Sequence, residues 1–335
     1  MKKIRTFINN SNLARFRFYF QIAAFILFIY GGYLSITISE RLPVFACPFN
    51  KVSGGTCYLM PLQHQLHITL NRFASSGGLH LLKGFLIFAG LSLIFSKGWC
   101  GYICPLGTIQ DWITKTRKYL HIRFSIYDKT VFDHLKKIKY ILLFLLILIP
   151  IGVKNSFVGL PVLPHDIFPP FCKICPGRIL LPLFSGNTSQ IYIDFSTKTA
   201  MFMTASGIII AGIFITGAFV KKRFFCLFCP MAVLLFIFSK VAFLRLNKDG
   251  AKCTRCGNCY RVCDVGIREI ADDITNKNIV KDDCIMCFKC VEACPENKCL
   301  TVSFLRIPLF TSTETGFFKR YTRKDHIPPD SRSVK

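Results

Sequence analysis

Residues 253–263 read CTRCGNCYRVC, and residues 284–295 read CIMCFKCVEACP. The two stretches repeat one spacing, C-x2-C-x2-C-x3-C, and corresponding cysteines are 31 residues apart. Thiols grouped this tightly are typical of metal ligands, because cysteines of an apolar core show no such regular spacing. The repeat therefore predicts a small C-terminal domain, over residues 247–303, that is organised around two metal centres.

This repeat resembles the cysteine pattern of bacterial two-cluster ferredoxins, in which the fourth cysteine of each run binds the neighbouring cluster. The resemblance implies an α+β ferredoxin-like domain with two [4Fe–4S] clusters. One cluster would be held by Cys253, Cys256, Cys259 and Cys294, and the other by Cys284, Cys287, Cys290 and Cys263. The second motif ends in the usual Cys-Pro, whereas the first has Asp264 after its last cysteine, a departure that removes no ligand.

A pair of zinc sites is the alternative interpretation of the repeat. Zinc ribbons use two cysteine pairs separated by a long gap, and the eight interleaved cysteines match that pattern less well. Cys299 lies outside the repeat, and we interpret it as a buried or free thiol.

The residues before this domain are strongly apolar. The whole chain of 335 residues is 52% hydrophobic, which is too apolar for an ordinary soluble protein. Its formal charge of +25 gathers in Lys and Arg residues beside long apolar runs, so we expect membrane lipids, and no nucleic acid, as the anionic partner.

Four apolar stretches are long enough to cross a bilayer, so residues 1–246 are expected to form a membrane α-helical bundle of about four transmembrane helices. They cover residues 18–38, 79–95, 139–153 and 199–220. A fifth stretch, 231–246, contains Lys240 and Arg245 and is expected to be an interfacial helix; if it crossed the membrane, the C-terminal domain would lie on the opposite side. The basic tail, 304–335, is expected to be disordered.

The basic residues also predict an orientation. The connection at 97–139 has nine Lys and Arg residues and the connection at 39–78 has three. Because basic loops stay inside, the N-terminus and the ferredoxin-like domain are expected on the cytoplasmic side of a prokaryotic inner membrane, in a multi-pass protein.

Two further cysteine motifs follow predicted spans: GWCGYICPLG at 98–107 and RFFCLFCP at 223–230. Each Cys-Pro runs into a helix-forming sequence, where proline suits the first helical position and the free amides of the helix start favour an anionic thiolate. A third cluster at the cytoplasmic face would be held by Cys100, Cys104, Cys226 and Cys229.

Four more cysteines fall in connections assigned to the outer side: Cys47, Cys57, Cys172 and Cys175. They predict either a further cluster at the outer face or one or two disulfides, since that compartment can be oxidising. Both interpretations remain open at the level of the sequence.

The Cys-Pro motifs beside membrane spans, together with the double repeat, resemble the NapH/MauN-type membrane polyferredoxins, a group related to NosR and CcoG. The chain departs from that pattern in having two residues between Cys226 and Cys229, where the group has three. The resemblance implies electron exchange between the quinone pool and partner redox proteins, such as a ferredoxin-type or terminal reductase subunit, as a quinol dehydrogenase component. Two alternatives are an accessory protein that reduces a metal or cofactor of a respiratory enzyme, as CcoG-like relatives suggest, and a redox-sensing membrane anchor.

No catalytic residue can be assigned from the sequence. Closeness to Cys100 and Cys104 suggests a quinone pocket formed by aromatic residues, with a nearby acid or imidazole as the proton acceptor. The aromatic candidates are Trp99, Tyr102 and Trp112, and the proton acceptors are Asp111 and His121.

Overall fold

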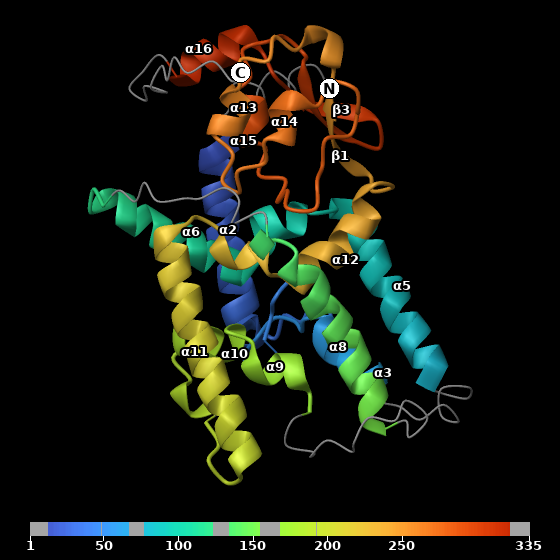
Figure 1. Ribbon diagram of the computed structural model, residues 1–335, viewed down its shortest axis with the longest axis vertical. Coiled ribbons are helices and arrows are strands. Elements are labelled where there is room, and N and C mark those ends of the chain that lie inside the picture. Colours follow the sequence, from blue (N-terminus) through green and yellow to red (C-terminus); the bar gives the residue numbers. More distant parts are fainter. Residues whose placement is uncertain are drawn as a thin grey trace.

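The computed structural model describes residues 13–47, 49–66, 77–122, 134–154, 168–191 and 193–321. It is mostly helical, with a small C-terminal sheet (Figure 1). Long helices run beside one another in the lower part of the molecule, and the domain that contains the cysteine repeat covers one of their ends. We call the first part the membrane domain and the second the head.

Three helices of the described residues are long and apolar enough to cross a membrane: α2 (Leu13–Tyr30), which continues into the 3-10 turn η1 (Gly31–Leu34), α5 (Gly78–Phe95) and α11 (Lys198–Val220). The 23 residues of α11 rise about 35 Å, enough for the hydrocarbon core. The predicted span at 139–153 forms α8 (Ile138–Lys154), whose apolar part is shorter. Large apolar side chains remain exposed on α5 and α11, as expected for lipid-facing surfaces.

Shorter elements fill the space between the long helices. At the end near the head lie η3 (a π-helical turn, Trp99–Ile103), α6 (Pro105–Tyr119), η7 (Phe224–Leu227) and α12 (Pro230–Ser239). Further from the head lie α3 (Leu59–Leu66), α9 (Pro170–Ile174), α10 (Gly177–Phe184) and η6 (Thr188–Gln190).

The head contains an antiparallel sheet of order β1-β2-β3, with Leu246 opposite Val302. Its strands are β1 (Leu244–Lys248), β2 (Leu300–Phe304) and β3 (Ile307–Thr311), and its helices are η8 (Gly250–Lys252), α13 (Asn258–Arg261), α14 (Glu269–Asp272), α15 (Lys289–Glu292) and α16 (Glu314–Tyr321). The sheet and the cysteine loops enclose one apolar core.

Two sequence-based boundaries are wrong. The helix predicted over 231–246 ends at Ser239, because Leu246 is fully buried in the strand that pairs with β2. The head therefore begins at 244. The tail predicted to be disordered over 304–335 includes β3 and α16, and residues 322–335 lie outside the described part of the chain.

The connection that follows α2 also differs from an exposed loop. Leu42, Val44 and Ala46 are at most 1% exposed and pack in the same core as residues of α2 and α6. A parallel bridge between Leu42 and Cys57 holds the connection in place. It therefore folds back into the membrane domain, which determines where its two cysteines lie.

Candidate iron–sulfur sites

The cysteine group furthest from the membrane domain, here called the distal head group, consists of Cys253, Cys256, Cys259 and Cys294. Its four thiols line one cavity of about 330 Å³. Gly257 turns the chain between Cys256 and Cys259 with a φ of 75°, which favours glycine. Cys256 is exposed, so this group reaches the surface, and Cys299 is buried beside it. The structure brings together the four cysteines expected from the interleaved pattern; their role as ligands stays a prediction.

The proximal head group consists of Cys263, Cys284, Cys287 and Cys290. These thiols are close enough to interact electrostatically with one another. The Ile267 amide donates to Cys263 Sγ at 3.5 Å, and the Met286 amide donates to Cys284 Sγ at 3.4 Å. Cys290 also interacts with Cys259, so the two head groups are neighbours.

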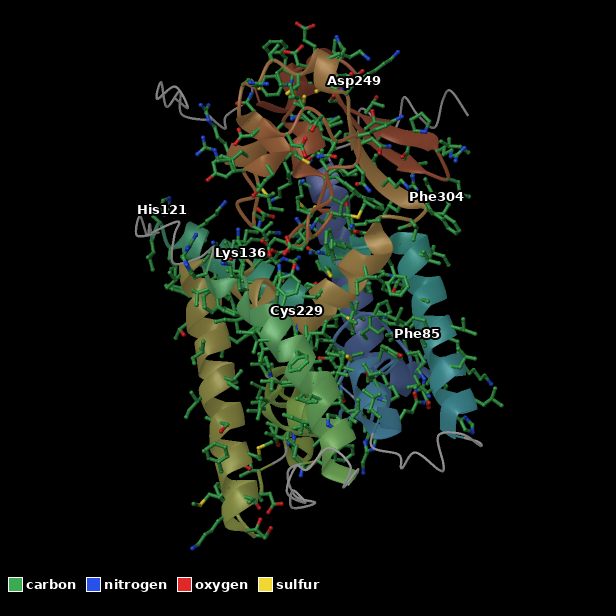
Figure 2. All side chains as sticks on the ribbon, turned by 45° about the vertical axis from the view of Figure 1, so that its right-hand side comes forward. Phe85, His121, Lys136, Cys229, Asp249 and Phe304 are labelled. Carbon is green, nitrogen blue, oxygen red and sulfur yellow. The ribbon has the colours of Figure 1, made fainter. Side chains whose placement is uncertain are left out.

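The junction group consists of Cys100, Cys104, Cys226 and Cys229, which line a cavity of about 480 Å³. Cys104 and Cys229 are the residues just before α6 and α12, and in each helix proline occupies the first turn, as the sequence predicted. Cys284 of the proximal head group lines the same cavity. Figure 2 shows Cys229 at the level where the head meets the long helices.

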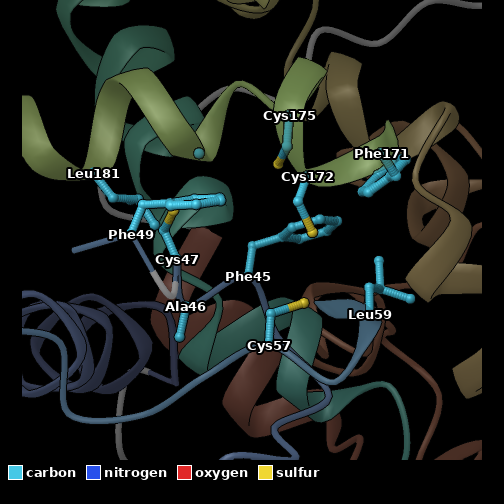
Figure 3. Close-up of a pocket in the computed structure, with 11 residues that line it drawn as sticks. Phe45, Ala46, Cys47, Phe49, Cys57, Leu59, Phe171, Cys172, Cys175 and Leu181 are labelled. Carbon is cyan, nitrogen blue, oxygen red and sulfur yellow. The ribbon is translucent and has the colours of Figure 1, made fainter. Parts of the chain in front are cut away.

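The interior group consists of Cys47, Cys57, Cys172 and Cys175, which line a further cavity of about 330 Å³ (Figure 3). Its location differs from the outer face that the sequence predicted. Cys47 and Cys57 belong to the apolar core that also contains Cys229, so the group lies within the membrane domain. Phe45 lines both this cavity and that of the junction group.

The four groups thus form a series: interior, junction, proximal head and distal head. Each adjacent pair is joined by a lining residue that both share or by an electrostatic interaction between thiols. Cys57, for example, interacts with Cys104 of the junction group. One continuous row of cysteine sites therefore runs from the membrane domain to the exposed end of the head.

The donor set fits iron–sulfur clusters better than zinc. A zinc ion bound at 2.3 Å requires its sulfur ligands to lie within about 3.8 Å of one another. Within the described residues, no group of three or more His, Cys, Asp or Glu side chains converges closely enough to hold a single metal ion. A [4Fe–4S] cube binds each thiolate to a different iron and suits wider groups. All 17 cysteines are free thiols in the structure.

A buried ion network lies beside the junction group, and no local sequence pattern predicts it. Asp111 accepts hydrogen bonds from Arg17 Nη2 at 2.7 Å, Gln21 Nε2 at 2.9 Å and Arg223 Nη2 at 2.6 Å. Burial alone would raise the pKa of Asp111, but Arg223 and Arg17 outweigh it and hold that pKa well below its usual range. These charges favour the ionised form of Asp111, which argues against the predicted role of its carboxylate as a proton acceptor for quinol.

The same network extends to Asp264, the residue that replaces the usual proline. Its carboxylate contacts Lys222 and Lys289 at 2.7 Å and Arg17 at 3.4 Å. Four basic side chains therefore face the two carboxylates of Asp111 and Asp264. This positive excess lies between the junction and proximal head groups, where it favours anionic thiolate centres.

A second contact joins the head to the start of α8. Lys139, which is fully buried, lies 2.6 Å from Asp283 and 2.7 Å from Asp282. Lys136 also pairs with Asp283, and Lys97 donates to the backbone carbonyl of Asp282. The head is thus held against the membrane domain by ion pairs at two places.

An apolar cavity of about 780 Å³, including its mouth, lies between α8 and α11. Its lining residues include Leu142, Ile210, Phe225, Phe228 and Cys175 of the interior group.

The aromatic pocket expected from the sequence differs from this cavity. Trp99 donates to the Leu91 carbonyl, Trp112 packs on Phe25, and Tyr102 packs on Phe288. These side chains do not line the cavity between α8 and α11, and His121 is exposed where α6 ends. The pocket predicted from the sequence and this cavity are therefore different places, and the predicted pocket stays a prediction.

Comparison with known proteins agrees with this arrangement. A family described as a 4Fe-4S dicluster domain matches residues 245–295. A family described as a 4Fe-4S binding domain matches twice, at residues 78–123 and 203–248, each time covering a long helix and the junction cysteines that follow it. The membrane domain therefore contains a repeated unit, although the two copies differ in cysteine spacing. No solved structure matches the chain significantly.

Several curated proteins are similar over most of the chain. An uncharacterised protein of Methanocaldococcus jannaschii is 25% identical over 68% of this chain and 82% of its own length. YccM of Escherichia coli, whose name assigns it provisionally to electron transport, is 23% identical over 73% of this chain and 61% of its own. The ferredoxin-type protein NapH of Escherichia coli is 23% identical over 64% of this chain, and the match covers 66% of the length of NapH. Taken with the cysteine arrangement, these matches make the chain a NapH-like membrane protein of the ferredoxin type with 4Fe-4S domains.

Proposed function

We propose that the protein transports single electrons between quinone in the membrane and a soluble redox partner. The apolar cavity between α8 and α11 is the observation that carries the quinone part of this proposal, because Cys175 lines both this cavity and that of the interior group. Oxidation of one quinol releases two electrons and two protons, and bound iron–sulfur clusters would accept the electrons one at a time.

The cavity suits a membrane-soluble ring. Its lining is entirely apolar and includes the aromatic rings of Phe171, Phe214 and Phe224. Ile213, which lines it, is 52% exposed on a helix surface that would face lipid, so a quinone could enter from the bilayer. Phe225 and Pro230 belong to both the cavity and the segments that carry Cys226 and Cys229.

The rest of the chain would keep the groups in a fixed series. Phe45 lies between the interior and junction groups, because its side chain lines both of their cavities. Asp264 and Lys139 hold the head so that the proximal head group stays beside the junction group. A fixed spacing matters because each electron passes between neighbouring centres.

The partner would dock at the exposed end of the head. Cys256 is exposed there, and the side chains of Arg255 and Arg261 are exposed beside it. A basic surface of this kind favours a partner with an acidic docking face, since complementary charges speed encounter.

The test uses anaerobically purified protein in lipid nanodiscs. The protein is reduced chemically, a soluble menaquinone analogue is added, and the [4Fe–4S]⁺ signals are followed by electron paramagnetic resonance. We expect rapid, saturable reoxidation by quinone, and reoxidation about tenfold slower in Ile210→Trp, which fills the cavity.

Ile209→Trp is the matched control, because Ile209 is 61% exposed on α11 and does not line the cavity. It should react like the unmodified protein. If quinone reoxidises all three proteins no faster than it reoxidises a soluble ferredoxin, the quinone proposal fails, and the accessory function in reducing a metal or a client enzyme becomes the better explanation.

A further inference from the structure

We infer that Cys47, Cys57, Cys172 and Cys175, the interior group, bind an additional [4Fe–4S] cluster inside the membrane domain. The matched 4Fe-4S families cover none of these four residues. Figure 3 shows the sulfur atoms of Cys57, Cys172 and Cys175 directed into the space between their segments. Four thiols that line one cavity supply the complete ligand set of one cube.

The backbone holds the two N-terminal cysteines rigidly. The Cys57 amide donates to the Ala46 carbonyl at 2.9 Å, and the Asn50 amide donates to the Cys47 carbonyl at 3.1 Å. These bonds fix two cysteines that are ten residues apart in sequence on the same side of the cavity. A preformed ligand set of this kind is what a resident cofactor requires.

Hydrogen-bond donors are directed at the sulfur atoms. Gln63, fully buried, donates from Nε2 to Cys172 Sγ at 3.3 Å, while its Oε1 accepts from the Phe171 amide at 3.1 Å. The Arg178 amide donates to the Cys175 carbonyl at 3.0 Å, which holds the backbone of Gly177 and Arg178 beside the Cys175 thiol. Gln63 Nε2 also donates to the Leu59 carbonyl at 2.9 Å, so one of its two N–H bonds is used within α3 and the other is directed at sulfur.

These donors distinguish a cluster from disulfides. A disulfide sulfur is neutral and a weak acceptor, so the N–H bond that Gln63 directs at Cys172 would lose much of its stabilisation. Cluster thiolates carry negative charge and accept such bonds well. The guanidinium of Arg178, 2% exposed, interacts electrostatically with both Cys47 and Cys172, which likewise favours an anionic group in the cavity.

The geometry also repeats that of the junction group. Cys175 is followed by Pro176 and α10, as Cys104 is followed by Pro105 and α6. Because Cys175 also lines the apolar cavity, this cluster would be the first centre to exchange electrons with quinone; that part of the inference rests on the proposed function.

The experiment counts iron and acid-labile sulfide in anaerobically purified protein. Four clusters predict about 16 iron atoms per chain, and Cys172→Ala/Cys175→Ala should retain about 12, with the head signals in electron paramagnetic resonance unchanged. Ile209→Trp is the control, because Ile209 is exposed on α11 and lines none of the cysteine cavities, and this variant should keep about 16.

Measurement on the unmodified protein decides the outcome even if the double variant does not fold. About 12 iron atoms, together with disulfides among these four cysteines found by mass spectrometry, would overturn the inference. So would one zinc ion per chain in place of the missing iron. None of these readouts depends on quinone, so the inference can fail while the proposed function stands.

Discussion

The head and the membrane domain assemble their cysteine groups in opposite ways. In the head, eight ligand candidates lie between residues 253 and 294, and each tight loop supplies three of one group. In the membrane domain, eight candidates are spread between residues 47 and 229, and each group combines two segments that are distant in sequence. Local chain geometry therefore organises the head, whereas tertiary packing organises the membrane groups, and the two should respond differently to mutation.

The largest difference is expected from the buried ion network. Arg223→Met leaves Asp111 buried without its main partner, which should lower the free energy of unfolding by about 3–5 kcal/mol. The variant should also lose the cluster bound by the junction group, while the head keeps its two clusters. Thermal unfolding in detergent measures the change in stability. Electron paramagnetic resonance of the two proteins measures which clusters remain.

Arg268→Met is the matched control for that change. The ion pair between Arg268 and Asp272 is largely exposed, so its loss should change stability by less than about 1 kcal/mol. Equal stability of the two variants would show that the membrane groups do not depend on the buried network.

The contrast also explains what the sequence could predict. The ligand grouping in the head follows from spacing alone, and proline at the first turn of α6 and α12 follows from its lost N–H. The role of Asp111 depends on Arg17 and Arg223, which are 94 and 112 residues away, so no local pattern reveals it.

The elements that were predicted wrongly depend on contacts between segments that are distant in sequence. Residues 240–246 form part of an apolar run that suits a helix, but pairing with β2, more than 50 residues later, draws its end into a strand. The inward fold of the connection after α2 depends on contacts with α2 and α6 that hydropathy cannot report.

The second prediction concerns the contact between the two regions. Asp264→Asn and Asp264→Pro both remove the charge that pairs with Lys222 and Lys289, and each should cost about 2–4 kcal/mol and loosen the head from the membrane domain. Limited proteolysis should release the head faster in both variants. Asp264→Pro restores the usual Cys-Pro sequence. If protease released its head no faster than that of the unmodified protein, a docking role for this carboxylate would be contradicted.

A smaller effect is expected where the two backbones meet. A Cβ atom at Gly101 would lie 2.3 Å from the Ile285 carbonyl oxygen, so Gly101→Ala should force the head to shift, at a cost of about 1–3 kcal/mol. Gly212 on α11 has no atom within 4 Å of the same position, so Gly212→Ala should stabilise its helix slightly. Opposite signs in the change of melting temperature would confirm close docking, and equal signs would contradict it.

The smallest effect is expected at His121, which is exposed and has a φ of 56°. Because that conformation favours glycine, His121→Gly should leave stability unchanged or raise it by up to about 1 kcal/mol, whereas His121→Ala should lower it slightly. Neither should alter the rate at which quinone reoxidises the reduced protein. If both variants slowed that reaction equally, the imidazole would be supplying protons to the quinone as it is reduced, and the site of quinone chemistry would have to be sought near α6 instead of between α8 and α11.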